Sequence, residues 1–134
     1  MSTNLNSTAT AYLGPNELVH FFDNVTGNII ASVQNQSSWN YGCTTINIDR
    51  SGNGAIPYLD ANAIYNATQK TILISPEFNN PTGVYDISLY YKDAEINGWM
   101  NATSNILADL GMVKSAAAIS NISPSNQYAN GITN

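Results

Sequence analysis

Hydrophobic and polar residues alternate with a period of two along several short segments of this chain. The clearest is residues 84–91, VYDISLYY, where Tyr85, Ile87 and Leu89 share one face and Asp86 and Ser88 share the other. Such alternation predicts a half-buried antiparallel strand. Similar patterns predict strands over residues 17–22, 29–34, 43–49, 71–75 and 112–119. The residues expected in the core are Phe21 or Phe22, Ile29, Val33, Ile46, Ile48, Ile72 or Leu73, Tyr85, Ile87, Leu89 and Val113.

The segment after residue 91 changes from strand to helix signals. Asp93 is a good helix N-cap, and Gly98 is a typical stop signal. The sequence therefore predicts a single helical turn over residues 94–97, with Trp99 packed back over the sheet.

Turn-forming residues separate the predicted strands. Residues 23–28 predict a hairpin loop, and residues 49–57, DRSGNGAIP, predict a long turn. Residues 76–83 predict a hairpin-type loop into the strand at 84–91. Residues 58–69 fit either a helical turn or an irregular connection, and residues 104–109 fit a second helical turn.

The spacing of these segments predicts an all-β fold. We expect an antiparallel β-sandwich, Ig-like or jelly-roll-like, with Greek-key connections and one or two short helical turns. Residues 17–122 form the predicted sandwich domain, and residues 123–134 a predicted exit linker. Residues 1–16 are expected to be a leader or an edge strand, and residues 1–12 could pair with a neighbouring chain in strand-mediated self-association.

Charge is sparse along the chain. Charged residues make up 10% of the composition, and the formal net charge is -5 with only four Lys and Arg residues. Average globular proteins carry about 25% charged residues. Four scattered cations cannot neutralise a phosphate backbone or an anionic membrane, so we expect no nucleic-acid partner and no membrane insertion. The lone Cys43 is expected to be a buried hydrophobe.

Four stretches carry a resemblance to a known family. They are FFDNVTGNIIASVQN, YGCTTINIDRSGNGA, NNPTGVYDISLYYKDAEINGW and MVKSAAAISNISPSN. Together they resemble a β-rich module of large secreted Bacteroidota proteins, typically next to a type IX secretion sorting domain. The resemblance covers roughly residues 17–126. Its sharper motifs are Tyr41-Gly42-Cys43 leading to Asp49-Arg50, and Ala94-Glu95 followed by Gly98-Trp99. It implies a secreted or cell-surface host protein, and it brings no catalytic residues.

The residues that could support catalysis do not form a recognisable set. His20 is the only histidine, no GxSxG motif is present, and most of the nine acidic residues lie in predicted turns or at strand ends. A lone histidine without a cysteine cluster also argues against a zinc site. The sequence therefore predicts a protein that is not an enzyme and has no cofactor, with calcium as the one exception to consider.

Residues 49–60 match the spacing of a twelve-residue calcium loop. Oxygen-bearing side chains fall at the ligand positions, with glycine at position six. The candidate ligands are Asp49, Ser51, Asn53 and Asp60. Only two of these are charged, and a strand rather than a helix precedes them. The alternative is a glycine-rich turn closed by the Asp49 side chain.

Aromatic residues in the predicted loops suggest a ligand surface. Trp39, Tyr41 and Tyr58 lie near Asn, Ser and Asp residues. Aromatic faces stack on sugar rings and amide side chains bind hydroxyls, so a polysaccharide or surface glycan is a candidate partner. The alternative is that these side chains cap the core.

The favoured function is a non-catalytic structural or adhesion module of a secreted or cell-surface multidomain protein, with neighbouring domains as its partners. The alternatives are a carbohydrate-binding module that uses loop aromatics and, after that, a small hydrolase accessory domain.

Overall fold

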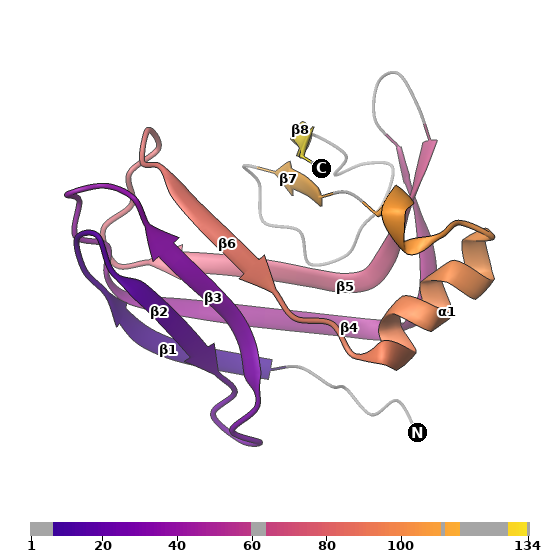
Figure 1. The fold of residues 1–134 in the computed structure, drawn as a ribbon, viewed down its shortest axis with the longest axis horizontal. Helices are drawn as coiled ribbons and strands as arrows, with labels where there is room; N and C mark the ends of the chain where they lie inside the picture. Colours follow the sequence, from indigo (N-terminus) through magenta and orange to yellow (C-terminus); the bar gives the residue numbers. More distant parts are fainter. Residues whose placement is uncertain (1–6, 60–63, 111, 116–128, 134) are drawn as a thin grey trace. The chain divides into compact units, whose positions relative to one another are not determined.

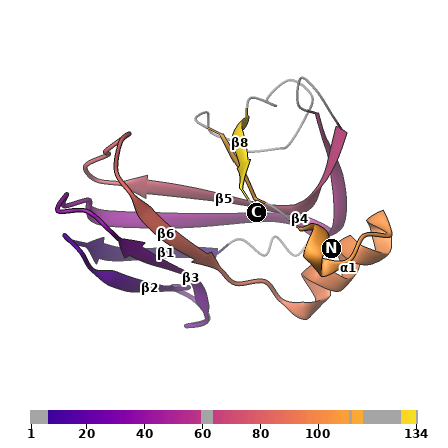
Figure 2. The same cartoon turned by 45° about the horizontal axis from the view of Figure 1, so that its top comes forward.

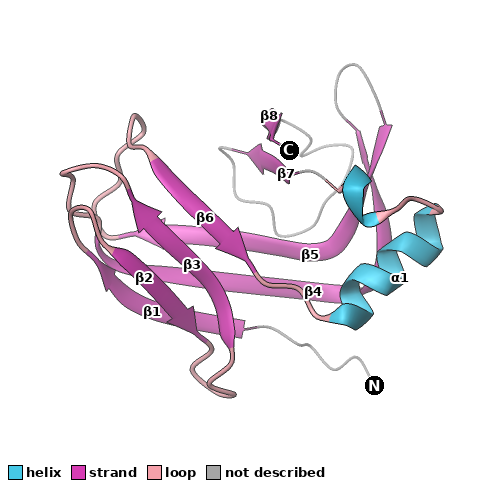
Figure 3. Cartoon of the chain, viewed as in Figure 1, coloured by secondary structure: helices cyan, strands magenta, loops and turns pink. Residues whose placement is uncertain are grey.

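A computed structural model describes residues 7–59, 64–110, 112–115 and 129–133 of the chain. These residues form mainly antiparallel β-structure with one α-helix (Figures 1 and 3). The elements, in chain order, are β1 (Ser7–Leu13), β2 (Leu18–Phe22), β3 (Ile29–Asn35), β4 (Gly42–Leu59), β5 (Ile64–Pro76), β6 (Tyr85–Leu89), α1 (Asp93–Thr103), the 3-10 helix η1 (Leu107–Asp109), β7 (Met112–Ser115) and β8 (Ala129–Thr133).

The chain divides into two compact units. The first, here the β unit, contains Asn6–Ile48 and Ile72–Tyr91. The second, here the helical unit, contains Met1–Leu5, Asp49–Thr71 and Lys92–Asn134. The long strands β4 and β5 therefore contribute residues to both units. The domain boundaries predicted at residues 17 and 122 remain predictions.

Two three-stranded sheets build the β unit, with strand orders β1-β4-β5 and β2-β3-β6. β1 runs antiparallel to β4, with Ser7 opposite Ile48 and Leu13 opposite Gly42. β3 runs antiparallel to both β2 and β6, so that Val33 lies between two antiparallel neighbours. The predicted hairpin formed by residues 17–22 and 29–34 is confirmed.

Side chains from both sheets form one hydrophobic core cluster. Its buried members are Ala9, Leu13, Phe21, Ile30, Ala31, Val33, Tyr41, Ile46 and Ile48. Ile72, Tyr85, Ile87 and Leu89 are half-buried against this cluster, while Phe22 and Leu73 are exposed. Strand alternation therefore identified four of the nine buried members, Phe21, Val33, Ile46 and Ile48, whereas the predicted Ile29 does not belong to the cluster. Val113 lies where no side chain is described.

Among the described residues, β6 pairs with β3 alone, so it is the edge strand of its sheet. Two predictions about the β unit are corrected. The connection at residues 77–84 is not a hairpin, because it joins β5 of one sheet to β6 of the other. Cys43 is exposed, because it lies on the opposite face of β4 from the buried Thr44 and Ile46.

The predicted turn at residues 49–57 is wrong, because β4 continues as a strand to Leu59. The neighbouring side chain of Gln69 explains the glycines in this segment. The Gly54 N–H donates to Gln69 Oε1 at 2.8 Å, and a Cβ on Gly52 would lie 2.5 Å from the same oxygen. Gly52 and Gly54 therefore make room for a side chain rather than reverse the chain.

The helix is longer than the predicted turn. α1 begins at Asp93 with Lys92 as the N-cap, and Ser104 ends it in a left-handed conformation with φ 61°. Gly98 does not stop the helix. A Cβ at Gly98 would lie 1.6 Å from the carbonyl oxygen of Asn53, so glycine permits close packing of α1 on β4.

The remaining described elements of the helical unit are short. β7 covers the first residues of the predicted strand at 112–119, and η1 lies inside the predicted turn at 104–109. β8 lies in the predicted exit linker and pairs with β7 (Figure 2).

β1 is the edge strand of its sheet, which is one of the two alternatives expected for the first residues. No helix in the described part of the chain is long and apolar enough to cross a membrane.

Candidate functional sites

The β3–β4 connection carries the first candidate site and is held by Asn35. This side chain is fully buried, and its amide donates to the carbonyls of Trp39 at 2.7 Å and Gly14 at 2.9 Å. Its Oδ1 accepts hydrogen bonds from the backbone N–H of Ser37 at 3.0 Å and from the Ser37 hydroxyl at 2.8 Å. Buried amides need such partners, and these hydrogen bonds hold the backbone of the β3–β4 connection in place.

Trp39 is 43% exposed at the surface of this loop. Its indole N–H donates to the carbonyl of Phe78 at 2.9 Å, and Phe78 is itself 52% exposed. The amide of Asn40 donates to the hydroxyl of Tyr12 at 2.5 Å, and Tyr12 is 54% exposed. We call Tyr12, Trp39 and Phe78 the aromatic patch.

Tyr41 is not at the surface. It is 5% exposed and belongs to the core cluster, as the core-capping alternative expects. Its hydroxyl faces Gly83, where a Cβ would lie 2.0 Å from the Oη atom, and the Oη atom has no hydrogen-bond partner among the described residues. The side chain of Tyr58 lies outside what the structure describes. Of the three predicted aromatic residues, Trp39 alone is placed at a surface.

Sequence reasoning missed Tyr12 and Phe78. β1 places Tyr12 opposite Cys43 on the exposed face of the sheet. Phe78 lies in the connection after β5, and its backbone N–H donates to the Tyr41 carbonyl at 3.0 Å. That cross-loop bond links two segments far apart in the sequence, and no local pattern signals it.

Three of the four candidate calcium ligands lie in a strand rather than in a loop. Asp49, Ser51 and Asn53 are residues of β4, and Asp60 lies outside the described residues. In the described part of the chain, no group of three or more His, Cys, Asp and Glu residues is placed to hold a metal ion. Calcium binding remains a prediction, but the turn on which it was based is not formed.

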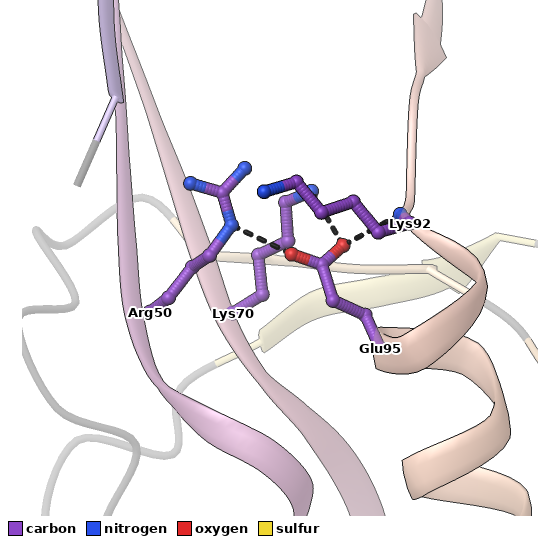
Figure 4. A network of polar contacts seen from close by, with 4 residues as sticks. All are labelled: Arg50, Lys70, Lys92 and Glu95. Carbon is purple, nitrogen blue, oxygen red and sulfur yellow. Dashed lines mark hydrogen bonds and ion pairs between the residues drawn. The ribbon is translucent and has the colours of Figure 1, made fainter. Parts of the chain in front are cut away.

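A buried charge cluster is the second candidate site, and the sequence did not indicate it. The carboxylate of Glu95 on α1 accepts from Arg50 Nε on β4 at 2.6 Å and from Lys70 Nζ on β5 at 3.1 Å (Figure 4). It also accepts from the backbone N–H of Lys92 at 2.9 Å. The side chains of Arg50, Lys70 and Glu95 are 8%, 2% and 5% exposed. We call Arg50, Lys70, Lys92 and Glu95 the charge cluster.

The protonation behaviour of the charge cluster follows from its contacts. Burial tends to raise the pKa of Glu95, but the Lys92 N–H and the Arg50 and Lys70 side chains together hold this pKa below its usual 4.5. Burial lowers the pKa of Lys70 from its usual 10.5, and Glu95 opposes that effect. Glu95 is therefore ionised at neutral pH and balances buried positive charge.

Asp23 is the other buried carboxylate of the described chain. It accepts from the Thr26 hydroxyl at 2.7 Å, the Thr26 N–H at 2.9 Å and the Thr8 N–H at 3.2 Å. The hydrogen bonds from Thr26 lower its pKa below the usual 3.8. Asp23 therefore closes the β2–β3 turn and ties it to β1.

The single histidine lies on β2 opposite Ser32 on β3. Its Nδ1 atom is 2.6 Å from the Ser32 hydroxyl, which is also 3.1 Å from the Tyr90 hydroxyl. Among the described residues, no hydrogen bond joins His20 to a carboxylate. In the described part of the chain, no carboxylate therefore occupies the position that orients the base of a Ser-His-Asp triad.

Comparison with protein-family models, with curated proteins and with solved structures finds no match to this chain. Function must therefore be argued from the two sites themselves.

Proposed function

We propose that this chain is a non-catalytic structural or adhesion module, with a β-sandwich as one of its two units, in a secreted or cell-surface multidomain protein. One observation carries the proposal: the buried carboxylates of the described chain, Asp23 and Glu95, are both occupied by internal hydrogen bonds and ion pairs. Each holds parts of the fold together rather than facing a substrate.

The electrostatics support a structural role for these acids. A general acid that works near neutral pH needs a raised pKa. The pKa values of Asp23 and Glu95 are both lowered. The hydrogen bonds that lower them stabilise the folded protein, which is what a load-carrying or spacing module requires.

The secreted or surface location rests on the resemblance to β-rich modules of secreted Bacteroidota proteins. The composition agrees, because Asn, Ser and Thr replace much of the usual surface charge. Neighbouring domains of a larger chain are then the main partners. Strand-mediated self-association through β1 is part of this proposal, because β1 is an edge strand.

Activity assays and surface labelling test the proposal together. Purified protein is incubated with chromogenic esters and glycosides beside a His20→Ala variant, and we expect no turnover from either. Antibodies against the module are expected to label intact cells of the source organism. Turnover that disappears in His20→Ala would support the hydrolase alternative, and labelling only after cell lysis would contradict a surface location.

A further inference from the structure

We propose that the aromatic patch binds a neutral polysaccharide. This function goes beyond a structural role, because it assigns a ligand class to the surface formed by Tyr12, Trp39 and Phe78. Three observations support the assignment: the rings are exposed, their backbones are fixed, and their unit lacks fixed positive charge.

Exposure of the rings is the first observation. The three side chains are between 43% and 54% exposed, although large aromatic residues usually bury most of their surface. Exposed aromatic faces offer apolar area to the C–H faces of sugar rings. Ser38 and Asn79, both exposed, lie next in sequence to Trp39 and Phe78 and can supply hydrogen bonds to sugar hydroxyls.

Fixed backbones are the second observation. Asn35 holds the Trp39 carbonyl, and the Trp39 indole N–H holds the Phe78 carbonyl. The Asn40 side chain donates to Tyr12 and accepts from the Gly42 N–H at 2.9 Å. A surface ordered before binding loses little conformational entropy when the ligand docks, which favours affinity.

Charge selects the ligand class. None of the four Lys and Arg residues falls within the β unit, which carries the carboxylates of Glu17, Asp23, Glu77 and Asp86. Glu77 adjoins Phe78, and its carboxylate accepts from the Cys43 N–H at 3.0 Å. An acidic polysaccharide would meet negative charge with no Lys or Arg of the β unit to offset it. A neutral polysaccharide, rich in hydroxyls, meets no such cost.

The experiment uses affinity electrophoresis and calorimetry with soluble polysaccharides. The neutral probes are hydroxyethylcellulose, xyloglucan, laminarin, mannan and arabinoxylan, and the acidic probes are alginate and polygalacturonate. The variants are Trp39→Ala and Phe78→Ala. The control is Phe22→Ala, because Phe22 is 53% exposed and Phe78 is 52% exposed. Thermal melting of each variant checks that the fold is retained.

We expect binding to at least one neutral probe and none to the acidic probes. Each patch variant should weaken the affinity about tenfold, the loss expected for one stacked ring, while Phe22→Ala leaves it unchanged. If a patch variant has a lower melting temperature than the wild type, Trp39→Phe is compared with Trp39→Ala. Trp39→Phe keeps an aromatic face, so it should retain more affinity than Trp39→Ala. Absence of binding to every neutral probe, equal weakening by Phe22→Ala, or preference for the acidic probes would overturn the proposal. The ester and glycoside assays and the antibody labelling do not depend on polysaccharide binding. Failure of the binding proposal can therefore be told apart from failure of the proposed structural function.

Discussion

The two units of this protein bury different kinds of side chain. In the β unit, aliphatic and aromatic residues from two sheets form the core, and the unit has no Lys or Arg. In the described part of the helical unit, the buried side chains are Arg50, Thr68, Lys70, Glu95 and Trp99. Among the described residues, the β unit therefore depends mainly on hydrophobic packing, and the helical unit on Trp99 together with hydrogen-bonded charges.

This difference predicts different weaknesses. Hydrophobic packing is insensitive to pH but sensitive to lost volume. A buried ion pair is sensitive to the loss of either partner and to protonation, because the charge left behind remains desolvated. The four predictions below test this contrast.

The largest effect is expected in the β unit from Phe21→Ala. Phe21 is 0% exposed and its neighbour Phe22 is 53% exposed, so the two residues form a matched pair on opposite faces of β2. Phe21→Ala should lower the free energy of unfolding by about 3–5 kcal/mol, through lost burial and the cavity left behind. Phe22→Ala should lower it by less than about 1 kcal/mol.

Urea unfolding, followed by far-ultraviolet circular dichroism, measures both variants. Amide hydrogen exchange by NMR shows which unit loses protection. Equal destabilisation by the two variants would show that the core does not lie on the Phe21 face.

The next effect is expected in the helical unit from Glu95→Gln. This variant leaves Arg50 and Lys70 buried beside a neutral amide, and it should cost about 3 kcal/mol at neutral pH. The control is Asp93→Asn in the same first turn, where the side chain is exposed and the expected cost is below about 1 kcal/mol. Fluorescence of Trp99 in a Trp39→Phe background follows unfolding of the helical unit, because the chain has only two tryptophans.

The cost of Glu95→Gln should depend on pH. The pKa of Glu95 is lowered in the folded state, so its contribution is complete above the usual 4.5 and disappears as the pH falls through the lower folded value. Wild type and variant should therefore differ in stability at pH 7 and converge in acid. Lys70 affects stability at alkaline pH. Its pKa is lowered in the folded state, so the free energy of unfolding increases as the pH rises toward 10.5. A difference that is constant between pH 7 and pH 3 would contradict an ionic role for Glu95.

A smaller effect is expected from Gly98→Ala in α1. Alanine normally stabilises a helix more than glycine does, but here its Cβ would collide with the Asn53 carbonyl oxygen. We expect a net loss of about 2 kcal/mol, because the obstacle is backbone and cannot rotate away. Asn97→Ala, at an exposed neighbouring position, should change stability by less than about 0.5 kcal/mol. Trp99 fluorescence again reports the unfolding, and stabilisation by Gly98→Ala would refute the close helix–strand contact.

Sequence patterns predicted the β unit better than the helical unit, for a physical reason. Period-two alternation is local and reports which face is buried, so β2, β3, β6 and the first half of β4 were predicted close to their observed bounds. Glycine is ambiguous, because it serves both turns and close approaches. Gly52, Gly54 and Gly98 were assigned to turns or stops, yet each makes room for a neighbour.

Both candidate sites were only partly visible in the sequence. Trp39 was predicted from its loop composition, but Tyr12 and Phe78 join it through contacts between distant segments. The charge cluster combines residues from β4, β5 and α1, which are scattered along the chain. Counting cations in the sequence could not show that three of the four lie around one carboxylate.

The smallest effect, an expected absence, concerns calcium at residues 49–60 in the helical unit. A calcium ion needs its oxygen ligands at about 2.3–2.6 Å, which requires the chain to curl around it. Asp49, Ser51 and Asn53 instead occupy alternate positions of β4, and alternate strand residues are about 6.6 Å apart along the backbone. Millimolar calcium, compared with a chelator, should therefore leave the melting temperature unchanged. An ion bound at a hundredfold excess over its Kd would add about 2.7 kcal/mol to the stability, enough to raise the melting temperature by several degrees. Such a rise, abolished by Asp49→Asn, would show that this segment can leave the strand to form a loop. The helical unit would then have a second electrostatic support beside the charge cluster, and its contrast with the β unit would be greater.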